Sequence, residues 1–232
     1  MKFSFFKSLL LLAVFFTSGA STFIYSQDVE VLSDFQAWGG LCFEKKVFKG
    51  FKLDFLEEYR FRKDARELYE SISQFGAAYK INRFMDIGVD YRFIIHRKPS
   101  DRFLYLHRFS VDFSLDKKTS VFQLKYRIKY QNKDDSYFSE NDDYIAVNFV
   151  RNRLQFNYTP GKMLPDFYLS AELFYKSTNQ EKEFSKVRYT LGMEIEIFRD
   201  NKIDLFYRID HTLNSIYREN IYIFGIEYNI KI

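Results

Sequence analysis

The last residues of the chain alternate between apolar and polar side chains with a period of two. Between Ile221 and Ile232 one face carries only aromatic and aliphatic residues: Tyr222, Phe224, Ile226, Tyr228, Ile230 and Ile232. The opposite face carries Gly225, Glu227, Asn229 and Lys231. A period of two with unlike faces predicts a β-strand that is apolar on one side and polar on the other.

Ten further stretches upstream show the same alternation. The eleven alternating segments cover about residues 34–46, 51–62, 67–81, 84–96, 102–115, 120–131, 144–158, 166–177, 184–198, 202–211 and 220–232. Most are long enough for transmembrane strands of about 9 to 11 residues, whereas strands of soluble proteins usually have about 5 or 6. The repetition predicts an all-β fold, an antiparallel up-and-down transmembrane β-barrel whose last strand meets an early one.

The connectors between these segments alternate in length. Tight connectors span residues 46–50, 82–83, 116–119, 159–165 and 199–201, and longer ones span residues 97–101, 132–143, 177–183 and 212–219. Short turns on one rim and longer loops on the other are typical of outer-membrane barrels, whose short turns are periplasmic. The C-terminus is therefore expected on the periplasmic rim.

The number of strands does not follow directly from the eleven segments, because bacterial single-chain barrels have even strand numbers. We expect twelve strands, with ten as the alternative. A twelfth strand would come from residues 28–34 or from a break of the first segment at Gly39 and Gly40. Ten strands would result if one weak segment did not pair.

Residues 1–26 have the three parts of a secretory signal peptide. Two lysines precede the apolar run Leu9–Phe16, and small residues follow it. Cleavage is expected after Ala20 or Ser26, which leaves residues 27–232 as a single barrel domain. We therefore expect export to the outer membrane of a Gram-negative bacterium, with the lipid bilayer as a partner and a monomeric state.

Composition and charge exclude further classes of protein. The formal net charge is +4 over 232 residues, and lysines and arginines are interleaved with Asp and Glu, so no basic patch indicates nucleic-acid binding. Cys42 is the only cysteine, so it forms no intramolecular disulfide and is expected to be a packed, inert residue.

A soluble β-sandwich would show the same alternation with its apolar faces turned inward. Strand length, the signal peptide and the connector pattern favour the membrane barrel. Tyrosines near segment ends also favour it, because such rings suit the interfaces of a bilayer. Examples are Tyr130, Tyr144, Tyr158 and Tyr175.

Several short stretches occur in a characteristic order. They are Trp38, LEEYRFR with Glu58 and Arg60, FGAAYKIN, IGVDYRF, LKYRIKYQ, VRNRLQFNY, LSAELFY, RYTLGMEIEI and YIFGIEYNIKI. In this order the chain resembles the outer-membrane β-barrel family catalogued as domain of unknown function 2490. The resemblance covers nearly the whole mature chain and implies an exported outer-membrane protein, without adding any chemistry. It also implies that the outer-membrane assembly machinery recognises the C-terminal strand.

If the apolar faces meet lipid, the charged faces meet in one lumen. The charges predicted to face it are Glu58, Arg60, Asp90, Arg92, Arg108, Asp112, Lys125, Arg127, Arg151, Arg153, Glu172, Arg188, Glu194, Glu196, Asp204 and Arg208. A barrel of about 10 to 12 strands is narrow compared with porins. These side chains would therefore form either a salt-bridged structural core or a small pore whose selectivity for solutes is set by rings of charge.

Two details refine the expected lumen. Arg127, Arg151 and Arg153 make an anion the first solute to test. Four glycines share the lumen-facing side of their strands and are expected to make room for neighbouring side chains. They are Gly76, Gly88, Gly192 and Gly225.

No pattern in the sequence indicates catalysis, a cofactor or a metal site. Neither His107 nor His211 has a serine two residues away on its own face, and His96 lies at a strand end. Residues 133–143 are rich in Asp and Glu, but their spacing matches no calcium loop. We expect no enzyme. The alternatives are a narrow channel for small solutes, surface recognition through a loop such as 133–143, and a lipid-modifying enzyme.

Overall fold

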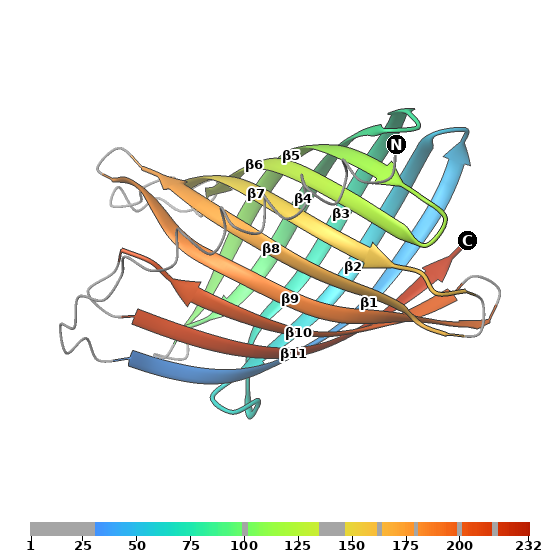
Figure 1. The fold of residues 1–232 in the computed structure, drawn as a ribbon. Coiled ribbons are helices and arrows are strands. Elements are labelled where there is room, and N and C mark those ends of the chain that lie inside the picture. The colour runs from blue at the N-terminus through green and yellow to red at the C-terminus, as the bar shows by residue number, and fades with distance from the viewer. Residues whose placement is uncertain are drawn as a thin grey trace, which may run out of the picture. The chain divides into compact units, whose positions relative to one another are not determined.

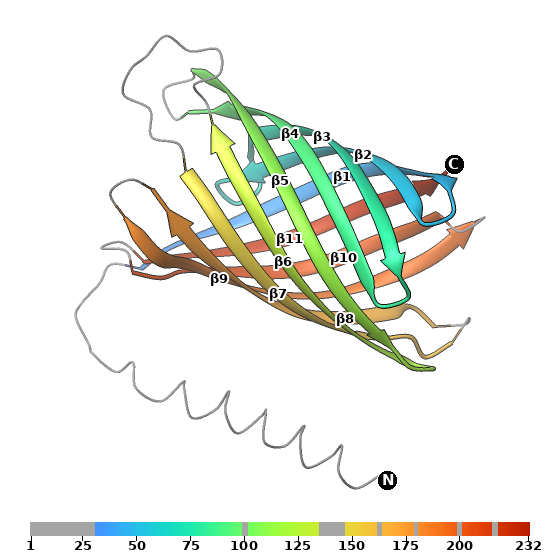
Figure 2. The same ribbon diagram turned by 90° about the horizontal axis from the view of Figure 1, so that it is seen from above.

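A computed structural model describes residues 31–98, 102–134, 147–161, 164–178, 181–198, 201–214 and 218–232. Residues Val31–Ile232 form one compact unit. The described residues contain eleven strands that close into a barrel (Figure 1; Figure 2). They are β1 Val31–Phe48, β2 Phe51–Arg62, β3 Glu67–Asn82, β4 Met85–Arg97, β5 Phe103–Lys118, β6 Phe122–Asp134, β7 Val147–Tyr158, β8 Asp166–Ser177, β9 Lys182–Phe198, β10 Asn201–Thr212 and β11 Arg218–Lys231.

Each of the eleven alternating segments forms one strand, with ends within three residues of those predicted. The expected signal peptide, residues 1–26, lies outside the described residues and stays a prediction. Within the described ranges, no helix combines the length and hydropathy that a membrane-spanning helix requires.

The expectation of twelve strands is wrong, and so is the alternative of ten. Residues 31–34 extend β1 and form no separate strand. Gly39 and Gly40 do not interrupt β1, because Gly39 pairs with Tyr59 of β2 on one side and with Ile226 of β11 on the other. A glycine is tolerated inside a strand where both neighbours hold the backbone in register.

The barrel closes through a parallel pair of strands. Ten pairs of neighbouring strands are antiparallel, so an odd number of strands leaves the first and last pointing the same way. β1 and β11 accordingly pair in parallel, from Val31 opposite Arg218 to Glu44 opposite Lys231. Parallel pairing satisfies the backbone groups as antiparallel pairing does, so the closed sheet has no free edge.

The two predicted sets of connectors lie at opposite ends of the barrel. The odd-numbered strands end at one rim, which we call the turn rim, and begin at the other, which we call the loop rim (Figure 1). The C-terminus lies at the turn rim, where the backbone amide of Ile232 donates to the carbonyl oxygen of Glu44.

The outer surface of the barrel is apolar and its interior is charged. Phe75, Phe103 and Leu191 are each 58% exposed on the outside. Glu172 and Asp210, in contrast, are only 3% exposed and lie inside. The sandwich alternative is wrong, because one closed sheet carries the apolar faces outward.

Two apolar clusters also lie inside the barrel. One consists of Trp38, Phe206 and Ile223, and the other of Ile72, Ile94 and Leu106. The ring of Phe206 occupies the space that a Cβ atom would need at Gly225, and the ring of Tyr168 does so at Gly192. The glycines make room for neighbouring side chains, as expected, and so allow Phe206 to pack beside Trp38.

The closing register can be tested with the single native cysteine. Cys42 of β1 stands opposite Asn229 of β11, and paired strands lie about 4.8 Å apart, within the range that a disulfide spans. Oxidation of the Asn229→Cys variant should therefore join residues 42 and 229, as measured by mass spectrometry of proteolytic fragments. The matched control Asn157→Cys on β7 should not join to Cys42. Failure of the first variant to cross-link in the folded barrel would contradict the parallel closure.

Candidate functional site

Two cavities occupy the interior of the barrel. The larger, which we call the loop cavity, has a volume of about 620 Å³ and reaches Lys176 near the loop rim. The smaller, which we call the turn cavity, has a volume of about 520 Å³ and reaches Gly50 at the turn rim. Arg127 and Lys129 line both cavities. These two cations therefore stand where the cavities adjoin.

The structure places almost all of the predicted lumen charges on these walls. The loop cavity is lined by Glu58, Arg60, Arg92, Arg108, Arg127, Arg151, Arg153, Glu172, Arg188, Glu194, Asp204 and Arg208. The turn cavity is lined by Asp90, Asp112 and Lys125. Glu196 lies near the turn-rim end of β9, opposite Lys202, where it is exposed and lines neither of these two cavities.

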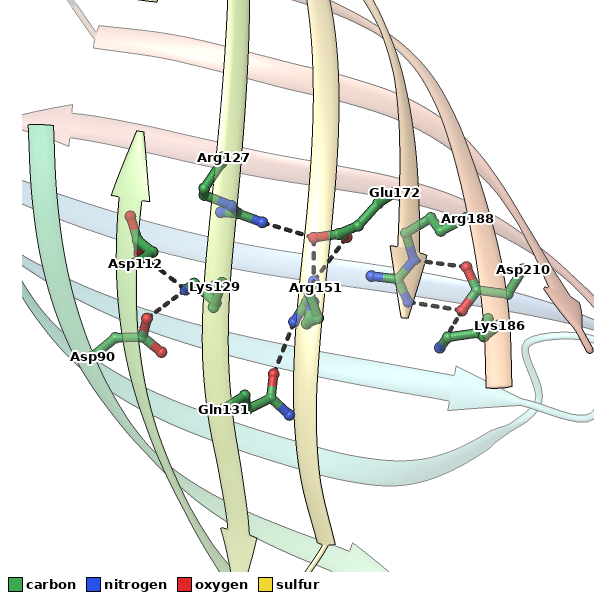
Figure 3. Close-up of polar contacts among 10 residues, drawn as sticks. All are labelled: Asp90, Asp112, Arg127, Lys129, Gln131, Arg151, Glu172, Lys186, Arg188 and Asp210. Atoms are coloured by element: carbon green, nitrogen blue, oxygen red, sulfur yellow. Dashed lines mark hydrogen bonds and ion pairs between the residues drawn. The ribbon is translucent and has the colours of Figure 1, made fainter. Parts of the chain in front are cut away.

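Glu172 joins three strands through two arginines (Figure 3). Its carboxylate accepts from Arg127 Nη2 at 2.9 Å and from Arg151 Nη2 at 2.8 Å. Arg151 also donates to Gln131 Oε1 at 2.9 Å. Glu172 comes from β8, Arg151 from β7, and Arg127 and Gln131 from β6, so one buried carboxylate fixes three neighbouring strands in register.

Asp210 forms a second centre on β10 (Figure 3). Arg188 binds it with two parallel hydrogen bonds, from Nε at 2.6 Å and from Nη2 at 2.7 Å. Lys186 adds a third at 2.8 Å. Two-pronged arginine–carboxylate pairs are among the strongest polar contacts in proteins. The ammonium group of Lys186 and the guanidinium group of Arg188 also lie 4.5 and 5.4 Å from the centroid of the Phe174 ring, within the range of cation–π interactions.

A third contact lies where the two cavities adjoin. The ammonium group of Lys129 on β6 binds the carboxylate of Asp90 on β4 and lies 3.4 Å from that of Asp112 on β5 (Figure 3). Lys129 is thus held between two carboxylates of one wall.

Trp38 lies among cations on β1, one of the two strands whose pairing closes the barrel. The guanidinium group of Arg60 lies 3.8 Å from the centroid of the indole ring, within the range of a cation–π interaction. Arg60 also binds Glu58 at 2.6 Å and Glu70 at 2.9 Å. The Trp38 Nε1 atom donates to Gln36 Oε1 at 3.1 Å. The buried indole therefore has both its face and its single donor occupied.

Cations outnumber carboxylates on the wall of the loop cavity. Eleven lysines and arginines line it, against five Asp and Glu. Asp210 and Glu70 do not line the cavity, but they pair with Arg188 and Arg60 and so neutralise part of this excess. Four arginines nevertheless have no carboxylate within 4.0 Å among the described residues. They are Arg92, Arg108, Arg153 and Arg208.

The prediction from sequence missed several members of the lumen. Lys129, Lys186 and Asp210 take part in the ion pairs but were not among the expected lumen charges. Strand parity would have found them, because each lies two residues from a predicted lumen arginine on the same strand. Parity also places Phe174 and Phe206 inside, beside Glu172 and Asp204.

The histidines lie in three different settings. His96 Nδ1 lies 3.1 Å from Glu70 Oε1, His107 Nδ1 lies 2.7 Å from the Tyr91 hydroxyl, and His211 is exposed. The described residues hold no group of three or more His, Cys, Asp and Glu side chains suited to a metal ion. Most of the acidic loop 133–143 lies outside the described residues, so its role stays a prediction.

A comparison with protein families matches residues 35–220 to the family described as protein of unknown function (DUF2490). The chain belongs to this family. The DUF2490 match begins within β1 and ends at the third residue of β11, so it covers most of the barrel. It confirms the resemblance seen in the sequence, and the family's description assigns no activity. A search of curated proteins finds no match.

The ion pairs of Glu172 predict a large cost for neutralising this carboxylate. Glu172→Gln leaves Arg127 and Arg151 without their buried counterion, so the free energy of unfolding should fall by about 3 kcal/mol. Urea unfolding of the purified protein measures this change.

A matched control is Glu44→Gln, because Glu44 pairs with Lys52 at 2.7 Å but both side chains are at least a third exposed. Its loss should cost at most about 1 kcal/mol. Equal urea midpoints for the two variants would contradict the assignment of Glu172 as a structural centre of the lumen.

Proposed function

We propose that this DUF2490 protein is an outer-membrane β-barrel whose lumen admits small anions. The observation that carries the proposal is the excess of cations on the wall of the loop cavity, including arginines without a carboxylate partner, inside a barrel with an apolar outer surface.

The apolar outer surface supports a location in lipid. Large aromatic and aliphatic side chains are exposed on all eleven described strands, and leaving such surface in water costs about 25 cal/mol per Å². A bilayer removes this cost. The shortest described strands have 12 residues, which exceeds the roughly 9 to 11 needed to cross a bilayer. The signal peptide expected over residues 1–26 supports export.

The arrangement of the cavities supports the passage of anions. Together the two cavities reach from Lys176 near the loop rim to Gly50 at the turn rim, and both are lined by Arg127 and Lys129. A solute moving between the rims therefore passes these cations. Rings of charged side chains select the sign of the ions that a pore admits.

A purely structural role is the weaker alternative. A structural core would keep each buried charge paired, whereas Arg108, Arg153 and Arg208 have no carboxylate partner in the described part of the chain. The proposal assigns no catalytic step. His96 is held by Glu70, which also binds Arg60, and such a chain of contacts suits an ion-pair network.

The proposal predicts anion-selective conductance. Purified protein in a planar bilayer, with a gradient of potassium chloride, should show discrete conductance steps and a zero-current potential of the sign given by chloride permeation. A silent membrane at all voltages would contradict passage through the lumen, and a cation-selective current would contradict the role of the arginines.

Lys129→Gln supplies the matched test of the wall between the cavities. It leaves Asp90 and Asp112 without the cation that they share, so the preference for chloride should weaken. The control Lys45→Gln removes the same charge from an exposed position outside both cavities. Its zero-current potential should equal that of the unchanged protein.

A further inference from the structure

Two pairs of arginines stand directly opposite each other on neighbouring strands. Arg92 of β4 is the register partner of Arg108 of β5, and Arg127 of β6 is the partner of Arg153 of β7. All four line the loop cavity. Like charges directly opposite each other in a sheet are destabilising, so each pair costs stability in the absence of an anion.

Several other opposed charges on the loop-cavity side of the sheet have opposite signs, although Lys129 stands opposite Arg151, and Asp204 stands opposite both Glu194 and Glu227. Arg60 stands opposite Glu70, and Arg188 stands opposite both Glu172 and Asp210. The sheet thus has positions where a carboxylate neutralises the arginine across from it. The two arginine pairs instead place guanidinium groups across from each other, and only Arg153 of the four has a carboxylate, that of Glu172, opposite it on its other side.

The hydrogen-bonding groups of these pairs are also incompletely used. The Nε atoms of Arg108, Arg127 and Arg153 are buried and have no acceptor among the described residues. Arg92 Nε donates to Gln74, a neutral amide that leaves its charge unbalanced. A buried donor without an acceptor costs about 1 to 3 kcal/mol, and more when it is charged.

We infer that Arg92, Arg108, Arg127 and Arg153 form a binding site for a divalent oxyanion, namely the phosphate group of a small solute. The inference rests on the admission of anions proposed above and names their chemical class. Guanidinium groups present planar forks of N–H donors that match the oxygens of phosphate. A phosphate dianion offers several oxygens and two charges to the four arginines, whereas chloride offers one charge and no directed acceptors.

Among the described residues, one carboxylate binds one of the four arginines, and it does not neutralise the site. Glu172 contacts Arg127, but it is shared with Arg151, which binds it through two of its own nitrogens. The four arginines therefore keep an excess of positive charge. The loop cavity reaches Lys176 near the loop rim, which gives a small solute a path inward.

The chain carries its own reporter for this site. Trp38 is the only tryptophan in the sequence, it lines the same cavity, and Arg60 lies against its ring. Rearrangement of the arginines around a bound anion should therefore change the fluorescence of the indole.

The test is a fluorescence titration of the full barrel in detergent with inorganic phosphate, compared with sodium chloride at equal ionic strength. Phosphate should produce a saturable change that chloride does not. Arg108→Gln and Arg153→Gln should each weaken phosphate binding at least about tenfold, because a hydrogen bond to a charged group is lost. The control Arg83→Gln alters an exposed arginine outside both cavities and should bind phosphate unchanged.

Stability separates binding from a merely structural role. Without phosphate, Arg108→Gln and Arg153→Gln should keep or raise the urea midpoint, because each relieves repulsion within a pair. With phosphate, only the unchanged protein and Arg83→Gln should gain stability. The inference is overturned if phosphate acts no differently from chloride, or if the two lumen variants bind it as tightly as the unchanged protein.

Two further arms separate related outcomes. Competition of glycerol phosphate with inorganic phosphate would support a site open to phosphate esters, including those of lipid headgroups. Failure of glycerol phosphate to compete would support a site for free phosphate. Anion-selective conductance without phosphate binding would overturn this inference and leave the proposed passage intact. Phosphate binding that depends on Arg108 and Arg153 in a barrel without conductance would support the site and contradict passage.

Discussion

Closure of the sheet is the constraint on which the rest of this structure depends. A strand in a closed sheet has two faces, and every side chain must point either outward or into the lumen. The alternation of apolar and polar residues therefore concentrates the charges inside a narrow barrel. The parallel pairing of β1 with β11 completes this closure and places Trp38 opposite Gly225. The antiparallel pairing of β1 with β2 places Arg60 on the other side of Trp38.

The charges inside the barrel separate into two groups with different consequences. Around Glu172 and Asp210, arginines and lysines meet buried carboxylates at hydrogen-bonding distance, and these contacts hold neighbouring strands in register. The pairs Arg92–Arg108 and Arg127–Arg153 instead place like charges opposite each other. Such pairs do not stabilise the sheet, and they are the basis of the anion site inferred above. Stability and the inferred binding thus rest on different contacts of one wall, and Arg127 takes part in both.

The sequence predicts the strands and their faces well because alternation is a local property. It placed Glu58, Arg92 and Arg208 inside the barrel correctly. The expectation of twelve strands is wrong because the general rule of even strand numbers does not hold for this chain, whose first and last strands pair in parallel. The contacts of Glu172 with Arg127 and Arg151 could not be predicted, since they depend on register between strands that are up to 45 residues apart. The fit of Phe206 over Gly225 likewise depends on the register between β10 and β11.

The central claim is that apolar faces meet lipid while charged faces meet the lumen. Spin labels on single cysteines along β9 test it most directly, in protein refolded into vesicles with Cys42 replaced by serine. Labels at Tyr189→Cys and Leu191→Cys should collide with oxygen dissolved in the bilayer, whereas a label at Thr190→Cys should be shielded from it. If the labels at 189 and 191 instead collide mainly with a water-soluble nickel chelate, the outer surface does not lie in lipid and the account is wrong.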